Sequence, residues 1–189
     1  MSSSKKWLTS LVFGLGLSFG TTAGAESVFS VVEASIPEIQ AALEDGRVTS
    51  RELVDQYLQR PALNELELRA TMAVNPDAQA IADRMDRERA EGGLRGPLHG
   101  IPIALKDNIH TTSMPTTGGA VAFEGFVPPY QATIVENLEN AGAIIFAKTT
   151  LTELANWVAT GMPNNYNALR GYAMNPYEPR RDPREGFND

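Results

Sequence analysis

Two short apolar runs separated by a helical pattern constrain the fold of this 189-residue chain more than any other feature. The runs 101–105 and 143–147 have the length and apolar character of strands buried on both faces of a sheet. The segment between them ends in a helical pattern that stops at Gly142 and carries its apolar face on Ile134, Leu138 and Ala141. A strand, a helix and a second strand in this order predict a parallel β–α–β unit. We therefore expect an α/β fold in which helices flank a mixed, largely parallel sheet.

Capping patterns predict two helices near the beginning of the chain. Ser35 and Thr49 each precede a segment with helical periodicity, and each is followed three residues later by a glutamate, Glu38 or Glu52. This spacing is typical of the capping box, in which each of the two side chains bonds a backbone N–H at the helix start. The apolar residues of both segments recur at helical spacing, so we interpret them as packing surface.

Three further elements complete the predicted order. A short strand is expected over residues 69–74, followed by a charged helix that Asn75 caps and that ends at Gly92. Thr150, with a glutamate in the capping-box position, predicts another helix after the second apolar run. Beyond residue 164 the chain is rich in Asn, Pro, Arg and Gly without periodicity, which predicts coil.

The charge and residue content exclude several classes of function. The chain carries 16 basic and 23 acidic residues, a net charge of −7, and no basic patch, so nucleic acid is not expected as a partner. It has no cysteine, which excludes disulfides, thiolate catalysis and cysteine zinc sites. Its two histidines, His99 and His110, match no common zinc motif. We therefore predict neither a metal site nor a cofactor.

Residues 1–25 have the three parts of a secretory signal peptide. Two lysines precede an apolar run over residues 7–20, and small residues follow it up to Ala25. The run is shorter than the roughly 20 residues that span a bilayer, so cleavage leaves no stable membrane span. An uncleaved anchor is the alternative. We expect an exported protein, periplasmic or secreted, whose mature domain is residues 26–189.

A lysine follows the first apolar run, at the end of a strand where α/β enzymes place their chemistry. No acidic residue precedes Lys106 in the strand. It is either a base or a strand-end charge paired with Asp107 or another loop carboxylate. A lysine acts as a base only when neutral, and burial favours the neutral state by lowering the lysine pKa. The interpretation as a base therefore predicts that Lys106 is buried.

The long loop after this strand is rich in glycine and proline, and loops of this length in compact domains are often functional. The candidates for lining a substrate pocket are Thr116, Thr117, Gly118 and Gly119, with an ordinary backbone turn as the equal alternative. Ser113, in the same loop, is a conceivable nucleophile, but no glycine-rich turn accompanies it.

Three other residues are interpreted as structural rather than catalytic. His99 lies among glycines that indicate a turn, so we expect it to form structural hydrogen bonds. Trp157, on the last predicted helix, is expected in the core. Asp107 is expected to form a turn at the end of the strand.

Several segments together resemble the amidase signature family of serine hydrolases. They are, in chain order, "SIPEIQAALEDGRVTSRELVDQYLQR", "GPLHGIPIALKDNIHTTSMPTTGG", "ATIVENLENAGAIIFAKTTLTELANW" and "NPYEPRRDP". The resemblance implies the N-terminal part of the amidase-signature fold. It also implies hydrolysis of the C–N bond of a small carboxylic amide by a Ser–cis-Ser–Lys triad, whose lysine corresponds to Lys106.

In this family the two serines belong to a "GGSSGG"-like stretch, and the present sequence contains no such stretch. We therefore expect residues 26–189 to be the N-terminal portion of an amidase domain, truncated before the Gly/Ser-rich signature. Such a chain carries only the lysine of the triad and is expected to be inactive alone. The alternative is a non-catalytic remnant or binding module on an α/β scaffold. The sequence points to no particular amide and to no particular oligomeric state.

Overall fold

The computed structural model describes residues 28–181, so the predicted signal peptide lies outside the described residues. The elements, in chain order, are α1 (Ile36–Glu44), α2 (Ser50–Leu68), β1 (Thr71–Val74), α3 (Ala78–Ala90), β2 (Pro102–Lys106), η1 (Val121–Phe123), α4 (Thr133–Asn140), β3 (Ile144–Thr149), η2 (Glu153–Asn156), β4 (Tyr166–Asn167) and β5 (Gly171–Tyr172). Within residues 28–181, no helix combines the length and the apolar character needed to cross a membrane.

Strand β3 lies at the centre of a three-stranded sheet, between β1 and β2. It runs parallel to β2 and antiparallel to β1. Helix α4 lies between β2 and β3 in the chain, so the predicted β–α–β unit is confirmed. Each strand of the unit extends past its predicted end, to Lys106 in β2 and to Thr149 in β3, and these two residues are paired in the parallel register.

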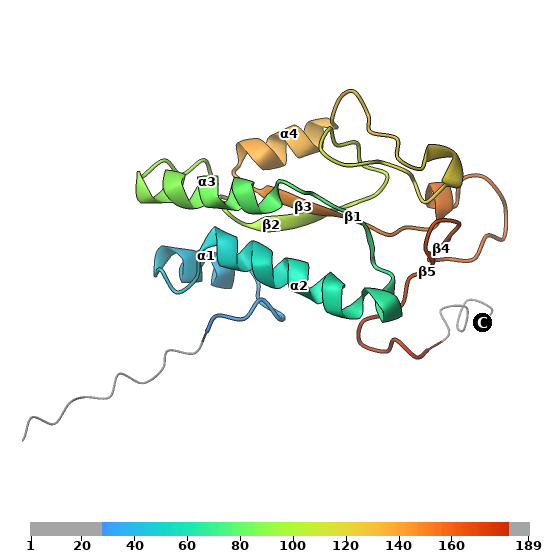
Figure 1. Ribbon diagram of the computed structural model, residues 1–189, viewed down its shortest axis with the longest axis horizontal. Coiled ribbons are helices and arrows are strands. Elements are labelled where there is room, and N and C mark those ends of the chain that lie inside the picture. Colours follow the sequence, from blue (N-terminus) through green and yellow to red (C-terminus); the bar gives the residue numbers. More distant parts are fainter. Residues whose placement is uncertain (1–27, 182–189) are drawn as a thin grey trace, which may run out of the picture.

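Helices cover both faces of this sheet, with α1 and α2 on one side and α4 on the other (Figure 1). The cluster under α4 consists of Leu105, Met114, Val135 and Ile145. The cluster on the opposite face, under α2 and α3, consists of Val54, Ala78, Ala82, Met85, Ile144, Phe146 and Ala147. Burial of these apolar side chains is the main driving force for folding. It holds the ends of β2 and β3 in fixed positions between two layers of helices.

The first two helices begin where the capping patterns predict. At the start of α2 the Glu52 N–H donates to Thr49 Oγ1 at 3.1 Å, and the Thr49 N–H donates to Glu52 Oε2 at 2.8 Å. Ser35 and Glu38 form the same device at the start of α1. These reciprocal bonds satisfy N–H groups that have no partner inside the helix. Both predicted helices are therefore confirmed.

The helix predicted after Thr150 is wrong. The chain forms only the short 3-10 segment η2, in which Leu154 and Ala155 have left-handed φ values of +45° and +56°. Tertiary hydrogen bonds compete with the helix here, because the Leu154 N–H donates to the Gly118 carbonyl at 2.7 Å. Trp157, expected in the core, is instead 90% exposed, since the element that would have carried it inward does not form.

Three smaller predictions also need correction. Asn75 does not cap α3, whose N-cap is Asp77; the Asn75 side chain donates instead to the Ile145 carbonyl at 2.8 Å. The inward residue at the start of α4 is Val135, which is fully buried, whereas Ile134 is 55% exposed. The segment after residue 164 is not entirely coil, because β4 and β5 pair as a short antiparallel hairpin.

Candidate active site

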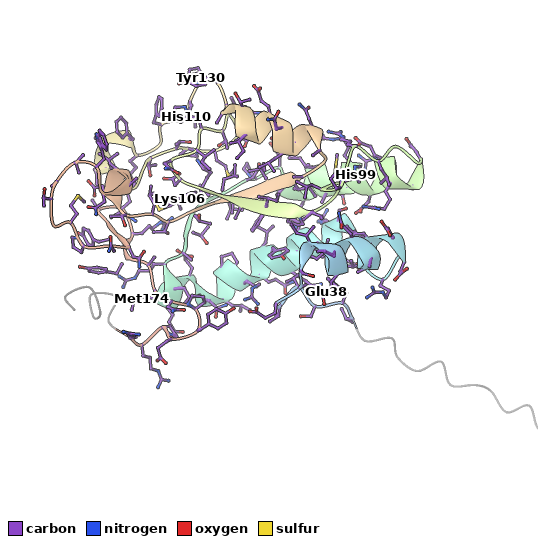
Figure 2. The ribbon with its side chains drawn as sticks, turned by 180° about the vertical axis from the view of Figure 1, so that it is seen from behind. Glu38, His99, Lys106, His110, Tyr130 and Met174 are labelled. Atoms are coloured by element: carbon purple, nitrogen blue, oxygen red, sulfur yellow. The ribbon has the colours of Figure 1, made fainter. Side chains whose placement is uncertain are left out.

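Lys106 lies at the carboxyl end of β2, where the strand meets the glycine-rich loop. Figure 2 shows it at the end of the sheet opposite His99. Its side chain is exposed, so the prediction that Lys106 is buried is wrong for the described part of the chain. The physical reason is that β2 is an edge strand here, bonded only to β3 among the described strands. Ala104, on the same face two residues earlier, is exposed as well.

A second lysine, Lys148 on β3, is completely buried. Its Nζ lies 3.4 Å from Asp107 Oδ1, and the Asp107 side chain is completely buried too. Lys148 Nζ also donates to Thr116 Oγ1 at 2.8 Å and to the Pro115 carbonyl at 3.3 Å. The ammonium therefore joins the centre of the sheet to the end of β2 and to the loop.

Sequence reasoning did not find this ion pair. The predicted strand stopped at Ala147, one residue before the lysine, and Asp107 was interpreted as a turn former. The available signal was a lysine that directly continues an apolar run, because such a lysine can be buried only with a partner. The alternative in which Asp107 pairs with a lysine is correct, but the partner is Lys148 and not Lys106.

Asp107 also holds the loop directly. Its Oδ2 accepts hydrogen bonds from the Thr117 N–H, at 3.1 Å, and from the Thr117 hydroxyl. Its backbone carbonyl accepts from the Gly118 N–H at 3.1 Å, and its own N–H donates to the Thr149 carbonyl at 3.0 Å. Oδ1 accepts no hydrogen bond from residues 28–181, which leaves Lys148 as its electrostatic partner.

The charge on Lys148 is balanced between two opposing effects. Burial lowers the pKa of its ammonium group, and the carboxylate of Asp107 acts in the opposite direction without cancelling the effect. The Thr116 hydroxyl, which accepts from Lys148, in turn donates to the Ile109 carbonyl at 3.3 Å. Both sides of this hydroxyl are engaged, so Thr116 is not placed as a free nucleophile.

The four loop candidates lie together beside this pair. Thr116 and Thr117 are each 7% exposed, and Gly118 and Gly119 adopt φ values of +60° and +77°. Thr116, Thr117 and Gly118 line a cavity of about 180 Å³ that also touches Asn108. Gly119 lies against Asn167, where an added Cβ would come within 2.6 Å of the asparagine Cβ. The loop is thus built around close backbone approach as well as around the cavity.

A separate groove of about 210 Å³ lies between α2 and the sheet. Ala104 and Thr149 form part of its wall, and Tyr57 and Leu68 of α2 face them. Ala104 shares a sheet face with Lys106, so the groove opens beside the exposed lysine. The two lysines therefore serve different regions: Lys148 the loop, and Lys106 the open edge next to the groove.

Ser113 and His99 have different outcomes. Ser113 is exposed, and the hydrogen bonds of residues 28–181 do not connect it to Lys106. The structural interpretation of His99 is confirmed: it is 2% exposed, its Nδ1 accepts from the Arg95 N–H at 3.2 Å, and its Nε2 lies 2.9 Å from the Met85 carbonyl. Among the described residues, no three His, Asp or Glu side chains are grouped so that they could hold a metal ion.

Comparison with known proteins gives one consistent family. The sequence model of the family described as Amidase matches residues 52–183. One relative is a glutamyl-tRNA(Gln) amidotransferase polypeptide of Synechococcus sp. strain CC9605. The chain is 46% identical to it over 114 residues, which cover 60% of this chain and 23% of the relative.

Solved structures agree with the sequence comparison. The native peptide amidase from Stenotrophomonas maltophilia superposes with a TM-score of 0.74 at 42% identity, over 77% of this chain and 30% of the other. A peptide amidase in complex with the competitive inhibitor chymostatin has a TM-score of 0.73, also at 42% identity, with the same coverage of both chains. The chain thus spans less than a third of the length of each of these three proteins. The described fold corresponds to the N-terminal portion of such enzymes.

Proposed function

Because this chain belongs to the amidase family, we propose that it provides the base-bearing N-terminal portion of an enzyme that hydrolyses carboxylic amide C–N bonds. The observation that carries the proposal is the position of Lys106 at the carboxyl end of β2, directly before the buried Asp107 that fixes the strand end. Strand ends of this kind are where α/β proteins hold reacting groups.

In the proposed reaction Lys106 Nζ is the final proton acceptor. A serine hydroxyl attacks the amide carbonyl carbon while its proton passes through a second serine to the neutral lysine. The C–N bond then breaks as the leaving nitrogen takes a proton back, and water releases the acyl group. Both serines would come from a Gly/Ser-rich stretch, which the printed sequence does not contain. Backbone N–H groups of that stretch would stabilise the tetrahedral oxyanion.

The exposure of Lys106 sets a condition on this chemistry. A neutral lysine requires removal from water, and residues 28–181 leave the Lys106 side chain exposed. A segment that brings the two serines must therefore also cover the open edge of β2. The adjacent groove beside Ala104 offers apolar surface for such a segment.

The loop is proposed to form one wall of the substrate pocket. Thr116, Thr117 and Gly118 line the cavity of about 180 Å³, whose size fits part of a small-molecule amide. Because the two threonine hydroxyls are occupied by Lys148 and Asp107, the wall would contact substrate mainly through its backbone and methyl groups. Gly119 would support this wall from behind, through its close approach to Asn167.

Export is proposed separately, from the pattern of residues 1–25. The charged start, the apolar run and the small residues up to Ala25 support cleavage after Ala25 and a periplasmic or secreted product. N-terminal sequencing of protein from separated cell fractions checks this. A protein in the cytoplasm that still begins at Met1 would contradict it.

A second candidate function is a binding module without catalysis. The exposed Lys106 and the unpaired edge of β2 favour it, because both leave a surface open for another chain. The two candidates differ in a simple way. A portion of an amidase restores turnover when it is joined to the missing serines, whereas a binding module does not.

The test is a hybrid enzyme. Residues 28–181 replace the matched portion of the Stenotrophomonas maltophilia peptide amidase, and turnover of that enzyme's amide substrate is measured beside the parent enzyme and beside the full 189-residue chain alone. We expect turnover by the hybrid and none by the full chain, because the groups of a triad act as a unit. A folded hybrid without turnover would favour the binding module.

A further inference from the structure

We infer that Lys148 and Asp107 are positioning residues for this reaction: together they hold Lys106 and the loop 116–119 in one fixed arrangement. The inference rests on the proposed role of Lys106 as the base. Neither residue is assigned contact with the substrate. Their part is to connect three segments that are distant in the sequence and that must meet at the site.

Lys148 makes the connection from the centre of the sheet. It follows the apolar part of β3 and is paired in register with Leu105, so its backbone is fixed by the two neighbouring strands. Its Nζ reaches Asp107 at 3.4 Å and Thr116 at 2.8 Å. A flexible side chain is thus held at its end by groups from the strand end and from the loop.

Asp107 makes the connection at the strand end. It is bonded to Lys106 by a peptide bond, and its N–H donates to the Thr149 carbonyl, which continues the β2–β3 ladder past the lysine. Its carboxylate and carbonyl accept from Thr117 and Gly118. Any displacement of Asp107 therefore moves both Lys106 and the loop. Catalytic groups lose efficiency when they are misplaced by even about 1 Å.

A buried ion pair is by itself a weak source of stability, because two apolar residues of similar volume often stabilise a core equally well. What such a replacement cannot reproduce is the set of bonds that the pair makes to the loop. This difference separates a positioning role from a merely structural one. It predicts that an apolar pair restores folding without restoring the geometry of the site.

The first experiment uses the full 189-residue chain and hydrogen exchange at the amides of Thr117, Gly118 and Gly119. Lys148→Met is compared with Arg95→Met, which removes a surface guanidinium 2.7 Å from Glu88. We expect exchange at the three amides to accelerate about tenfold or more in Lys148→Met, because their acceptor Asp107 loses its partner, and to stay unchanged in Arg95→Met. Unchanged exchange in a folded Lys148→Met chain would overturn the inference.

A second variant covers the case in which Lys148→Met unfolds. The double variant Asp107→Leu with Lys148→Met leaves no buried charge, so it should melt near the wild-type temperature. Its three loop amides should still exchange faster than in the wild type, because they have lost their acceptor. Wild-type protection in the double variant would overturn the inference.

The second experiment measures kcat and KM in the hybrid enzyme. We expect both variants to lower kcat by about a hundredfold, with KM within about threefold of the unmodified hybrid, because the base is misplaced while substrate contacts remain. Full recovery of kcat in the double variant, together with its stability, would show a merely structural role. Lys106→Ala is measured alongside. Its full activity would refute the proposed function, while the exchange data would still decide whether the pair holds the loop.

Discussion

Lys148 Nζ lies 3.4 Å from Asp107 Oδ1, and neither side chain has any exposed surface. This single relationship links β3, the end of β2 and the glycine-rich loop, since Lys148 also donates to Thr116 and Asp107 accepts from Thr117. The candidate base, Lys106, is the residue directly before Asp107. The buried pair therefore explains how an exposed lysine on an edge strand keeps a defined backbone position.

Removing one partner of this pair should be costly. We expect Lys148→Met to lower the free energy of unfolding by about 3–5 kcal/mol, because it leaves the Asp107 carboxylate buried without a counter-charge. Arg95→Met, which breaks the surface pair with Glu88, should cost less than about 1 kcal/mol. Denaturant unfolding of the full chain measures both. Equal losses in the two variants would contradict the importance assigned to burial.

Stability should also depend on pH through Lys148. Its pKa in the folded chain is lowered by burial, below the value of about 10.4 expected when it is unfolded. Between the two pKa values the unfolded chain binds more protons, so this lysine contributes stability above the unfolded pKa and loses it as the pH falls through the folded one. The unfolding free energy of the wild type, relative to Lys148→Met, should therefore rise as the pH approaches the unfolded pKa. A constant or falling difference would count against a lowered pKa.

The glycine loop should tolerate a side chain only where space allows. Gly119 and Gly125 have similar φ values, +77° and +74°, but an added Cβ meets Asn167 at 2.6 Å in the first case and nothing within 4 Å in the second. We expect Gly125→Ala to cost about 1–2 kcal/mol from the left-handed backbone alone. Gly119→Ala should cost about 1–3 kcal/mol more, from overpacking. Thermal melts compare them, and similar losses would refute the close approach.

The open edge of β2 should promote association. Unpaired strand edges with apolar surface invite pairing with other chains, and a lysine on the edge suppresses it. Ala104→Lys, on the edge strand, should therefore reduce light scattering of the full chain on heating. Ala62→Lys adds the same charge at an exposed position of α2 and should have little effect. If both variants reduce scattering equally, net charge rather than the edge is responsible.

The sequence allowed prediction of those elements whose causes are local. The two capping boxes at Ser35 and Thr49 and the β–α–β unit were predicted because each depends on residue spacing within a short segment. The family resemblance, carried by the segments around Lys106, is confirmed by the family match over residues 52–183 and by the superposition on the peptide amidase.

The remainder depends on contacts between distant segments. The turn at Leu154 replaces a predicted helix because its N–H bonds to Gly118, a residue far earlier in the chain. The partner of Asp107 could not be identified without the register that brings Lys148 beside it. The exposure of Lys106 follows from its place on an edge strand, which depends on strand order and not on the residues of β2 themselves.

The most direct test of the account is the turnover of the hybrid enzyme with Lys106 replaced. Alanine removes the proton acceptor, and arginine keeps the charge but cannot deprotonate in the working range. For both Lys106→Ala and Lys106→Arg we predict a loss of kcat of about a thousandfold or more, with circular dichroism and melting temperature unchanged. A folded Lys106→Ala hybrid that hydrolyses the amide at a near-normal rate would contradict the assignment of Lys106 as the base.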